Sequence, residues 1–121
     1  MTNRFAASLQ WTLSLYHEGI LITDFDASIE FGWWFIDNAT QEIEWEVDAF
    51  VFEKCFQAYD APHGKWIITR TQTRVTPKSN IALWTVLSGI VNDPREQQAI
   101  HERLVEQLIA DGDIKRVREA V

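Results

Sequence analysis

Hydrophobic and polar residues alternate over much of the first 75 positions, which is the period of a strand with one buried face. Residues 8–16 place Leu9, Trp11, Leu13 and Leu15 on one side, although a helical stripe can also be drawn through this segment. The alternation favours a strand. The segment His17-Glu18-Gly19 predicts a turn, and the apolar run that follows predicts a second strand or a loop.

The segments 29–36 and 43–52 are rich in aromatic and β-branched residues, which favour strands. The polar residues 37–41 between them predict a hairpin loop. Residues 59–64 contain a proline and a glycine and predict a further turn, after which residues 65–75 alternate again. The pattern therefore predicts an antiparallel sheet of about four to five strands, roughly over residues 8–75.

The last third of the chain changes to a helical pattern. Residues 81–91 are almost entirely apolar, and Asn80 before them is a suitable N-cap, so we predict a helix over roughly 80–91 although a buried strand stays open. Asp93, Pro94 and Glu96 form a capping-box-like start, and Gly112 is a typical stop. This predicts a second helix over roughly 94–110 and an α+β fold, one sheet packed by two C-terminal helices in a single domain spanning 1–121.

Charge is distributed unevenly along the 121 residues, whose net charge is −7. Residues 1–60 hold eleven acids and two bases, which gives −9, and residues 61–121 hold nine bases and seven acids, which gives +2. Phosphate and anionic lipid repel an acidic protein. We therefore expect a basic protein as the partner, and neither direct nucleic-acid binding nor membrane contact; self-association stays open.

A ladder of carboxylates is the clearest local feature, and we call it the acidic ladder: Glu42, Glu44, Glu46 and Asp48. Alternate residues of a strand share one face, so these four side chains would repeat about every 6.8 Å. That spacing also matches two steps along one DNA strand, roughly 3.4 Å each, so mimicry of a nucleic acid is a special case. A plain solvated face is the simpler interpretation.

Two adjacent tryptophans, Trp33 and Trp34, would point to opposite sides of a strand. One is expected to enter the core, and the other is a candidate anchor for a partner. The basic residues Arg70, Arg74 and Lys78 are expected to pair with acids of neighbouring strands, and an anion or RNA contact is the alternative.

Residue types that carry catalysis or bind metals are scattered. His17, His63 and His101 have no metal-ligand spacing, and Asp24 and Asp26 are interpreted as solvated loop acids or turn formers. The single Cys55 is interpreted as a small core residue. We predict no catalytic residue, no metal and no cofactor. Because no signal peptide or spanning segment is evident, we expect a cytoplasmic, reducing environment.

Together these features predict a small protein-binding module, such as an inhibitor, an immunity or antitoxin-like protein, or an adaptor. The acidic ladder with Trp33 or Trp34 would form its binding face.

Two alternatives stay open. A small-ligand-binding domain or enzyme would gather Trp11, Trp45, Trp66 and Trp84 around a pocket. A subunit of a larger assembly would use the basic segment 115–118 for docking.

Overall fold

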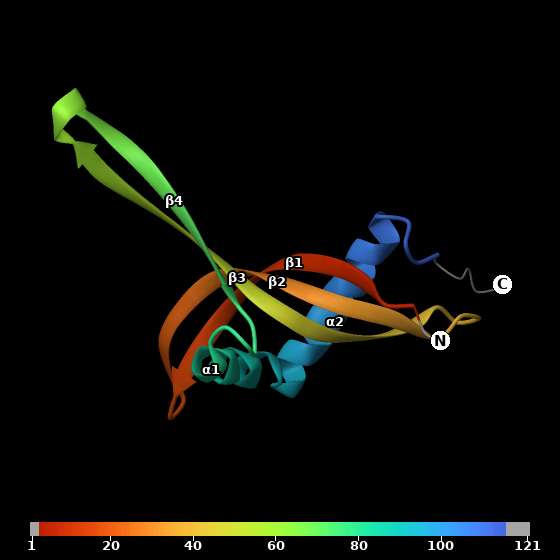
Figure 1. The fold of residues 1–121 in the computed structure, drawn as a ribbon. Helices are drawn as coiled ribbons and strands as arrows, with labels where there is room; N and C mark the ends of the chain where they lie inside the picture. Colours follow the sequence, from red (N-terminus) through yellow and green to blue (C-terminus); the bar gives the residue numbers. More distant parts are fainter. Residues whose placement is uncertain (1–2, 116–121) are drawn as a thin grey trace.

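The computed structural model describes residues 3–115, apart from the side chains of residues 55 and 56. Residues 116–118 of the basic C-terminal segment lie outside the described residues. Four antiparallel strands form one sheet in the order of the chain, and two helices follow them (Figure 1). The elements are β1 (Phe5–His17), β2 (Ile20–Asp37), β3 (Glu42–Asp60), the short 3-10 helix η1 (Ala61–His63), β4 (Lys65–Val75), α1 (Ile81–Val91) and α2 (Pro94–Ala110). The predicted α+β fold is confirmed, and residues 81–91 are a helix.

Strand β2 is longer than the sequence pattern indicated, because it runs without a break from Ile20 to Asp37. Asp24 and Asp26 are therefore strand residues, and the prediction of loop acids is wrong. Their carboxylates accept hydrogen bonds from the facing hydroxyls of β1, at 2.6 Å from Ser14 and 2.7 Å from Thr12. Cross-strand hydrogen bonds of this kind give a strand carboxylate the partners that backbone amides would give it in a turn.

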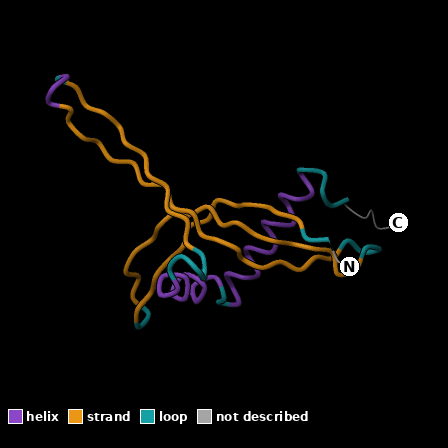
Figure 2. The backbone as a smooth tube through the Cα atoms, viewed as in Figure 1, coloured by secondary structure: helices purple, strands orange, loops and turns teal. Residues whose placement is uncertain are grey.

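The sheet splits because its strand pairs do not overlap fully. Strand β3 pairs with β2 only as far as Ser28 and Val51, whereas its pairing with β4 continues to Asp60 and Lys65. Residues 52–60 and 65–73, joined by η1, therefore form a two-stranded ribbon, which we call the arm. Figures 1 and 2 show the arm projecting away from the rest of the molecule. Residues 11–27 form a second two-stranded extension, which we call the β1–β2 end.

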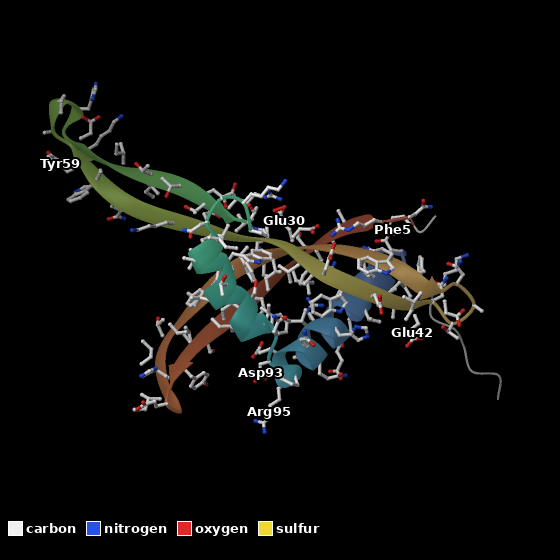
Figure 3. All side chains as sticks on the ribbon, turned by 60° about the horizontal axis from the view of Figure 1, so that its bottom comes forward. Phe5, Glu30, Glu42, Tyr59, Asp93 and Arg95 are labelled. Atoms are coloured by element: carbon white, nitrogen blue, oxygen red, sulfur yellow. The ribbon has the colours of Figure 1, made fainter. Side chains whose placement is uncertain are left out.

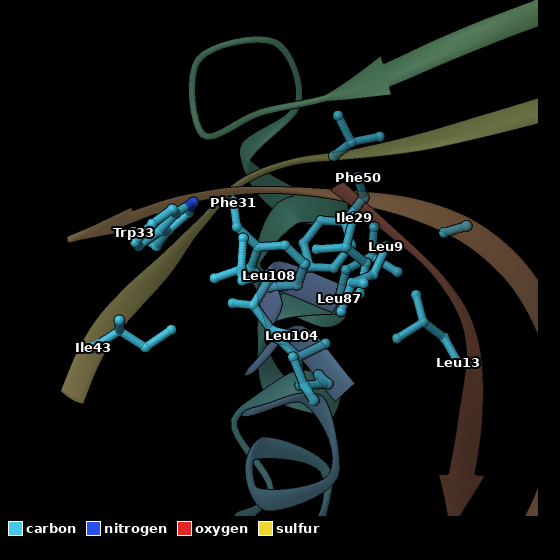
Figure 4. Packing of buried hydrophobic residues seen from close by; sticks show 14 of the residues in the cluster. Leu9, Leu13, Ile29, Phe31, Trp33, Ile43, Phe50, Leu87, Leu104 and Leu108 are labelled. Atoms are coloured by element: carbon cyan, nitrogen blue, oxygen red, sulfur yellow. The ribbon is translucent and has the colours of Figure 1, made fainter. Parts of the chain in front are cut away.

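The core lies between one face of the sheet and the two helices (Figure 4). Leu13, Ile29 and Phe50 point from the sheet into this layer, and Leu87 of α1 and Leu104 of α2 meet them, each at most 1% exposed. Burying five such side chains provides on the order of 10 kcal/mol of hydrophobic free energy. The helices cover the sheet from β1 to β3, and no described helix covers the arm.

Both helices begin at the predicted caps. The side chain of Asn80 accepts the Leu83 amide at 3.1 Å, and Asp93 accepts the amides of Arg95 and Glu96 at 3.0 and 3.4 Å. Glu96 does not complete a capping box. Its carboxylate instead accepts the indole N–H of Trp11 at 2.9 Å, which joins the first turn of α2 to β1.

The end of α2 is a Schellman motif, with Gly112 in the left-handed region at φ 81°. The Gly112 amide donates to Ile109 at 3.1 Å, and the Asp113 amide donates to Leu108 at 2.9 Å. The turn brings Ile114 into the core at 5% exposure. The chain after α2 is thereby directed back onto the sheet.

Candidate functional site: the outer face of the sheet

The face of the sheet opposite the helices, which we call the outer face, is polar and carries most of the strand carboxylates. Its centre is an open hollow of about 430 Å³. Glu30 lies here (Figure 3). Residues of all four strands line the hollow: Ser8, Gln10, Asp26, Ala27, Ser28, Glu30, Val51, Glu53, Gln72 and Arg74. Short side chains on β1 and the middle of β2 leave room for the hollow, and longer charged ones border it.

The acidic ladder lies at one end of this face. Glu42, Glu44 and Glu46 are exposed and Asp48 is half-buried, while Trp45 between them packs on the core side. The alternation predicted this arrangement. A register shift occurs where Glu30 pairs with Ala49 and the next residue of β2 pairs with Val47, so that Asp48 is an extra residue in β3. This β-bulge interrupts the regular two-residue repeat.

Arg4 forms ion pairs with two of the four carboxylates of the acidic ladder. Its guanidinium donates to Asp48 at 2.6 and 3.1 Å and to Glu46 at 2.5 Å. These three charge-assisted bonds raise the pKa of Arg4 above its usual value, and those to Asp48 contribute more than the one to Glu46.

Gly32 makes room for this arrangement. A Cβ at Gly32 would overlap the Arg4 guanidinium where it lies on the strand, so any other residue would displace the end of this flexible side chain. Arg4 was not among the predicted site residues. The only signal for it was a glycine inside a strand, which often marks a close approach of another group.

A second ion pair closes the other side of the hollow. Arg74 of β4 reaches across β3 to Glu30 of β2, with Nε and Nη2 at 3.0 and 3.2 Å from the two carboxylate oxygens. The hydrogen bonds with Glu30 raise the pKa of Arg74. Arg70 lies farther along, 3.9 Å from Glu53. The predicted pairing of β4 cations with strand acids is confirmed for both arginines.

Glu42 and Glu44 remain without an ion-pair partner among residues 3–115. Glu44 pairs in register with Trp34, which is half-buried on the outer face. Trp34 is therefore the available aromatic of the tryptophan pair, and it lies beside a carboxylate without a counterion.

Trp33 is only 2% exposed, so its assignment as a partner anchor is wrong. Its ring packs against Phe5 and Phe35, with centroids 4.7 and 5.2 Å away. The indole N–H has no hydrogen-bond partner in the described structure, and a buried donor of this kind costs about 1–3 kcal/mol. The surrounding aromatic contacts offset that cost.

The four tryptophans of the predicted ligand pocket do not meet. Trp11 and Trp45 each bond to α2, the latter donating to His101 Nδ1 at 3.1 Å, and Trp84 packs on the ring of Phe50. Trp66 lies on the arm and is 67% exposed. In the described structure these side chains tie the helices to the sheet or lie on the arm, and they do not line one cavity.

The polar side chains outside this face show no second cluster. Among the described side chains, which do not include that of Cys55, no three His, Asp or Glu residues gather closely enough to hold a metal ion. His63 contacts Asp60 at 2.7 Å at the tip of the arm. No described helix has both the length and the apolar character needed to cross a bilayer. Comparisons of the chain with protein-family models, curated proteins and solved structures found no match.

Proposed function

We propose that this chain is a protein-binding module whose outer face receives a basic surface of a partner. One observation carries this proposal: on a single face of the described structure, carboxylates outnumber the cations, which are Arg4, Arg70 and Arg74. The carboxylates are Asp24, Asp26, Glu30, Glu42, Glu44, Glu46, Asp48 and Glu53. Such a field speeds the encounter with a cationic partner and orients it.

Glu42, Glu44 and Trp34 are the residues that we expect to dominate the contact. A carboxylate without an internal counterion gains most from an incoming lysine or arginine. Trp34 offers an aromatic surface beside it, and tryptophans often contribute a large share of binding energy when a partner covers them. Glu46 and Asp48 are already satisfied by Arg4, so they contribute less.

The hollow is the natural place for a cationic side chain of the partner. Asp26, Glu30 and Glu53 border it, and only Arg74 among its lining residues is basic. Arg74 is held by Glu30, whereas Asp26 has only the neutral Thr12 hydroxyl as a partner and Glu53 has Arg70 at 3.9 Å. A lysine or arginine entering there would replace water at these carboxylates with charge-assisted bonds.

Mimicry of a nucleic acid receives less support. A phosphate mimic needs evenly spaced charges without counterions. The bulge at Asp48 breaks the spacing, and two of the four carboxylates share Arg4 as a counterion. The proposal therefore concerns a basic protein surface. The chain would act as an inhibitor, an immunity or antitoxin-like protein or an adaptor according to what that partner does.

The test is affinity capture from a lysate of the native cells, with nuclease added to remove nucleic-acid bridges. The variant Glu42→Lys with Glu44→Lys reverses the two charges that lack a partner and keeps the Arg4 pairs. The matched control is Glu102→Lys with Glu106→Lys, which makes the same change of charge on the exposed side of α2. Trp34→Ala tests the aromatic separately.

We expect a basic protein to be captured by the wild type and by the α2 control, and to be lost with the Glu42 and Glu44 variant. Its binding to the purified chain should also weaken as salt is added, because salt screens exposed charges. Equal loss in both double variants would show that only net charge matters. Capture of no basic protein by the wild type would rule out the proposal.

A further inference from the structure

The arm exposes several large apolar side chains, and its own two strands cannot bury them. Tyr59 is 56% exposed, Trp66 and Ile68 are each 67% exposed, and Ile67 is 41% exposed. A two-stranded ribbon without a cover is marginally stable in water. Long strands with open edges are also sites at which another chain can attach. The arm is therefore a segment that gains stability from an external surface.

Three of these side chains lie together on one face of the arm. Tyr59 pairs in register with Trp66, and their ring centroids are 5.3 Å apart. Ile68 lies two residues farther along the same strand, so it shares the face of Trp66. We call Tyr59, Trp66 and Ile68 the arm tip; Figure 3 labels Tyr59 at this position, remote from the helices.

A groove elsewhere on the molecule has matching properties. It lies between the end of β1 and the helices and has a volume of about 590 Å³. The lining residues are Ser14, Leu15, Tyr16, Val86, Gly89, Ile90, Asp93, Arg95 and Glu96. Within it Tyr16 is 61% exposed and Val86 is 49% exposed. A volume of this size accommodates a tryptophan with a neighbouring aliphatic side chain.

Gly89 gives this groove an unusual floor. It lies inside α1, where glycine costs roughly 0.5–1 kcal/mol relative to alanine. Apart from its chain neighbours and the backbone of α1 itself, no atom lies within 4 Å of the position that a Cβ would take. Nothing within the described protomer therefore requires glycine there. A group from outside that approaches the helix backbone closely would require it.

We propose that the arm tip of one copy of this chain inserts into the groove over Gly89 of a second copy. Charge supports this occupant. The arm carries Lys54, Lys65 and Arg70 against Glu53 and Asp60, a net charge of +1. The groove carries Asp93 and Glu96 against Arg95, a net charge of −1. The two surfaces therefore differ in sign, although the whole chain is acidic.

The area also fits. Taking about 200 Å² for each large side chain, the exposed fractions of the three arm-tip residues leave roughly 380 Å² uncovered. A reciprocal pair of arm-and-groove contacts, counted on both surfaces, would bury roughly 1,500 Å². Stable protein interfaces bury roughly 1,200–2,000 Å².

The first test measures the molar mass of the purified chain by light scattering over a range of concentrations. The wild type should associate to a multiple of its 14.1 kDa. Trp66→Ser with Ile68→Ser removes the arm tip, and Gly89→Gln fills the groove; each should give a monomer. Both changes are at exposed or open positions, and Gly89→Gln should raise helix stability. Thermal unfolding verifies that each variant is folded.

Ile36→Ser is the matched control. Ile36 is an isoleucine that is 50% exposed, and it lies near the C-terminal end of β2, outside the arm tip and the groove. This variant should associate as the wild type does. Mixing the arm variant with the groove variant should restore a weaker association through a single contact, since one supplies an intact groove and the other an intact arm. Trp66→Cys mixed with Val86→Cys, both in a Cys55→Ser background, should form an intermolecular disulfide between the two variants.

A wild type that stays monomeric over the whole range would overturn the proposal. Association that survives both the arm and the groove variants would do the same. The arm could instead serve a nucleic acid, and that outcome would appear as a monomer that binds an oligouridine probe and loses it with Trp66→Ser. The outer-face variants do not touch the arm tip or the groove, so this proposal and the proposed function can fail independently.

Discussion

Two hairpin extensions leave the centre of the sheet, and they differ in how far their apolar side chains are buried. The β1–β2 end buries Leu13 and Ala27 at 0% and 2% exposure, because helix α1 and the start of α2 lie across its inner side. Beyond Phe52 at its base, which packs against Phe25, the arm has nothing across either side in the described structure, and Trp66 and Ile68 remain 67% exposed. The comparison shows that an alternating pattern predicts a strand with one apolar face. It does not predict which element, if any, packs against that face.

Connectivity explains the difference. The chain leaves β4 at its base, next to the centre of the sheet, and α1 then turns back toward β1. The Trp11 to Glu96 hydrogen bond fixes the start of α2 on the same side. Both helices are thereby committed to the β1–β2 end and the central sheet. Within residues 3–115 no further element covers the arm, which is consistent with a second copy doing so.

The largest expected contrast between the two extensions is in amide hydrogen exchange. In the monomeric Gly89→Gln background, the amides of Gln57 and Thr69 on the arm should exchange through local opening, and those of Leu13 and Ala27 through far rarer opening. We expect the opening free energies to differ by about 3 kcal/mol or more, because local stability follows buried apolar contact. Exchange followed by NMR measures this. Equal protection at both ends would remove the basis of the comparison.

Shortening an apolar side chain should give the next largest difference in unfolding free energy between the two extensions. Leu13→Ala, at a position with 0% exposure, should lower the free energy of unfolding by about 2–5 kcal/mol. Ile68→Ala should change it by less than about 0.5 kcal/mol, because that side chain is largely in water. Urea unfolding in the same Gly89→Gln background gives both values. A large loss from Ile68→Ala in the monomer would mean that the arm is covered within one chain.

A polar link should show a smaller contrast. Trp11→Phe removes the donor to the Glu96 carboxylate, a half-buried bond of 2.9 Å, and should cost about 1.5–3 kcal/mol. Tyr59→Phe on the arm removes the hydroxyl of an exposed residue, so the free energy of unfolding should hardly change. The same urea titrations compare them. A neutral Trp11→Phe would indicate that α2 is held on β1 by packing alone.

The helix cap should give the smallest effect of this series. Asn80→Ala removes the side-chain acceptor of the Leu83 amide at the start of α1 and should cost about 1 kcal/mol. Asn38→Ala in the exposed β2–β3 turn serves as the control and should stay within about 0.5 kcal/mol. In the Asn80→Ala variant, hydrogen exchange should show reduced amide protection at the β1–β2 end and unchanged protection in the arm. This result would show that α1 is the element that protects the β1–β2 end.

Local patterns in the sequence determined a large part of the fold. The alternation of residues 29–36 and 43–52 predicted their hairpin, and Asn80 and Asp93 predicted where both helices begin. The same alternation placed Glu42, Glu44 and Glu46 on one exposed side of a strand. These features depend on neighbours within a few residues, so a single chain segment contains the information.

Only the tertiary structure decided which of these residues are available. Arg4 reaches Asp48 over 44 positions, and Glu96 leaves its expected cap to accept Trp11 over 85 positions. Trp33 and Trp34 have the same local pattern, and the side on which the helices pack buries the first. The sequence likewise indicated strands at both extensions, and the path of the chain after β4 covered one and left the other open. Such outcomes depend on contacts between distant segments, which local periodicity does not specify.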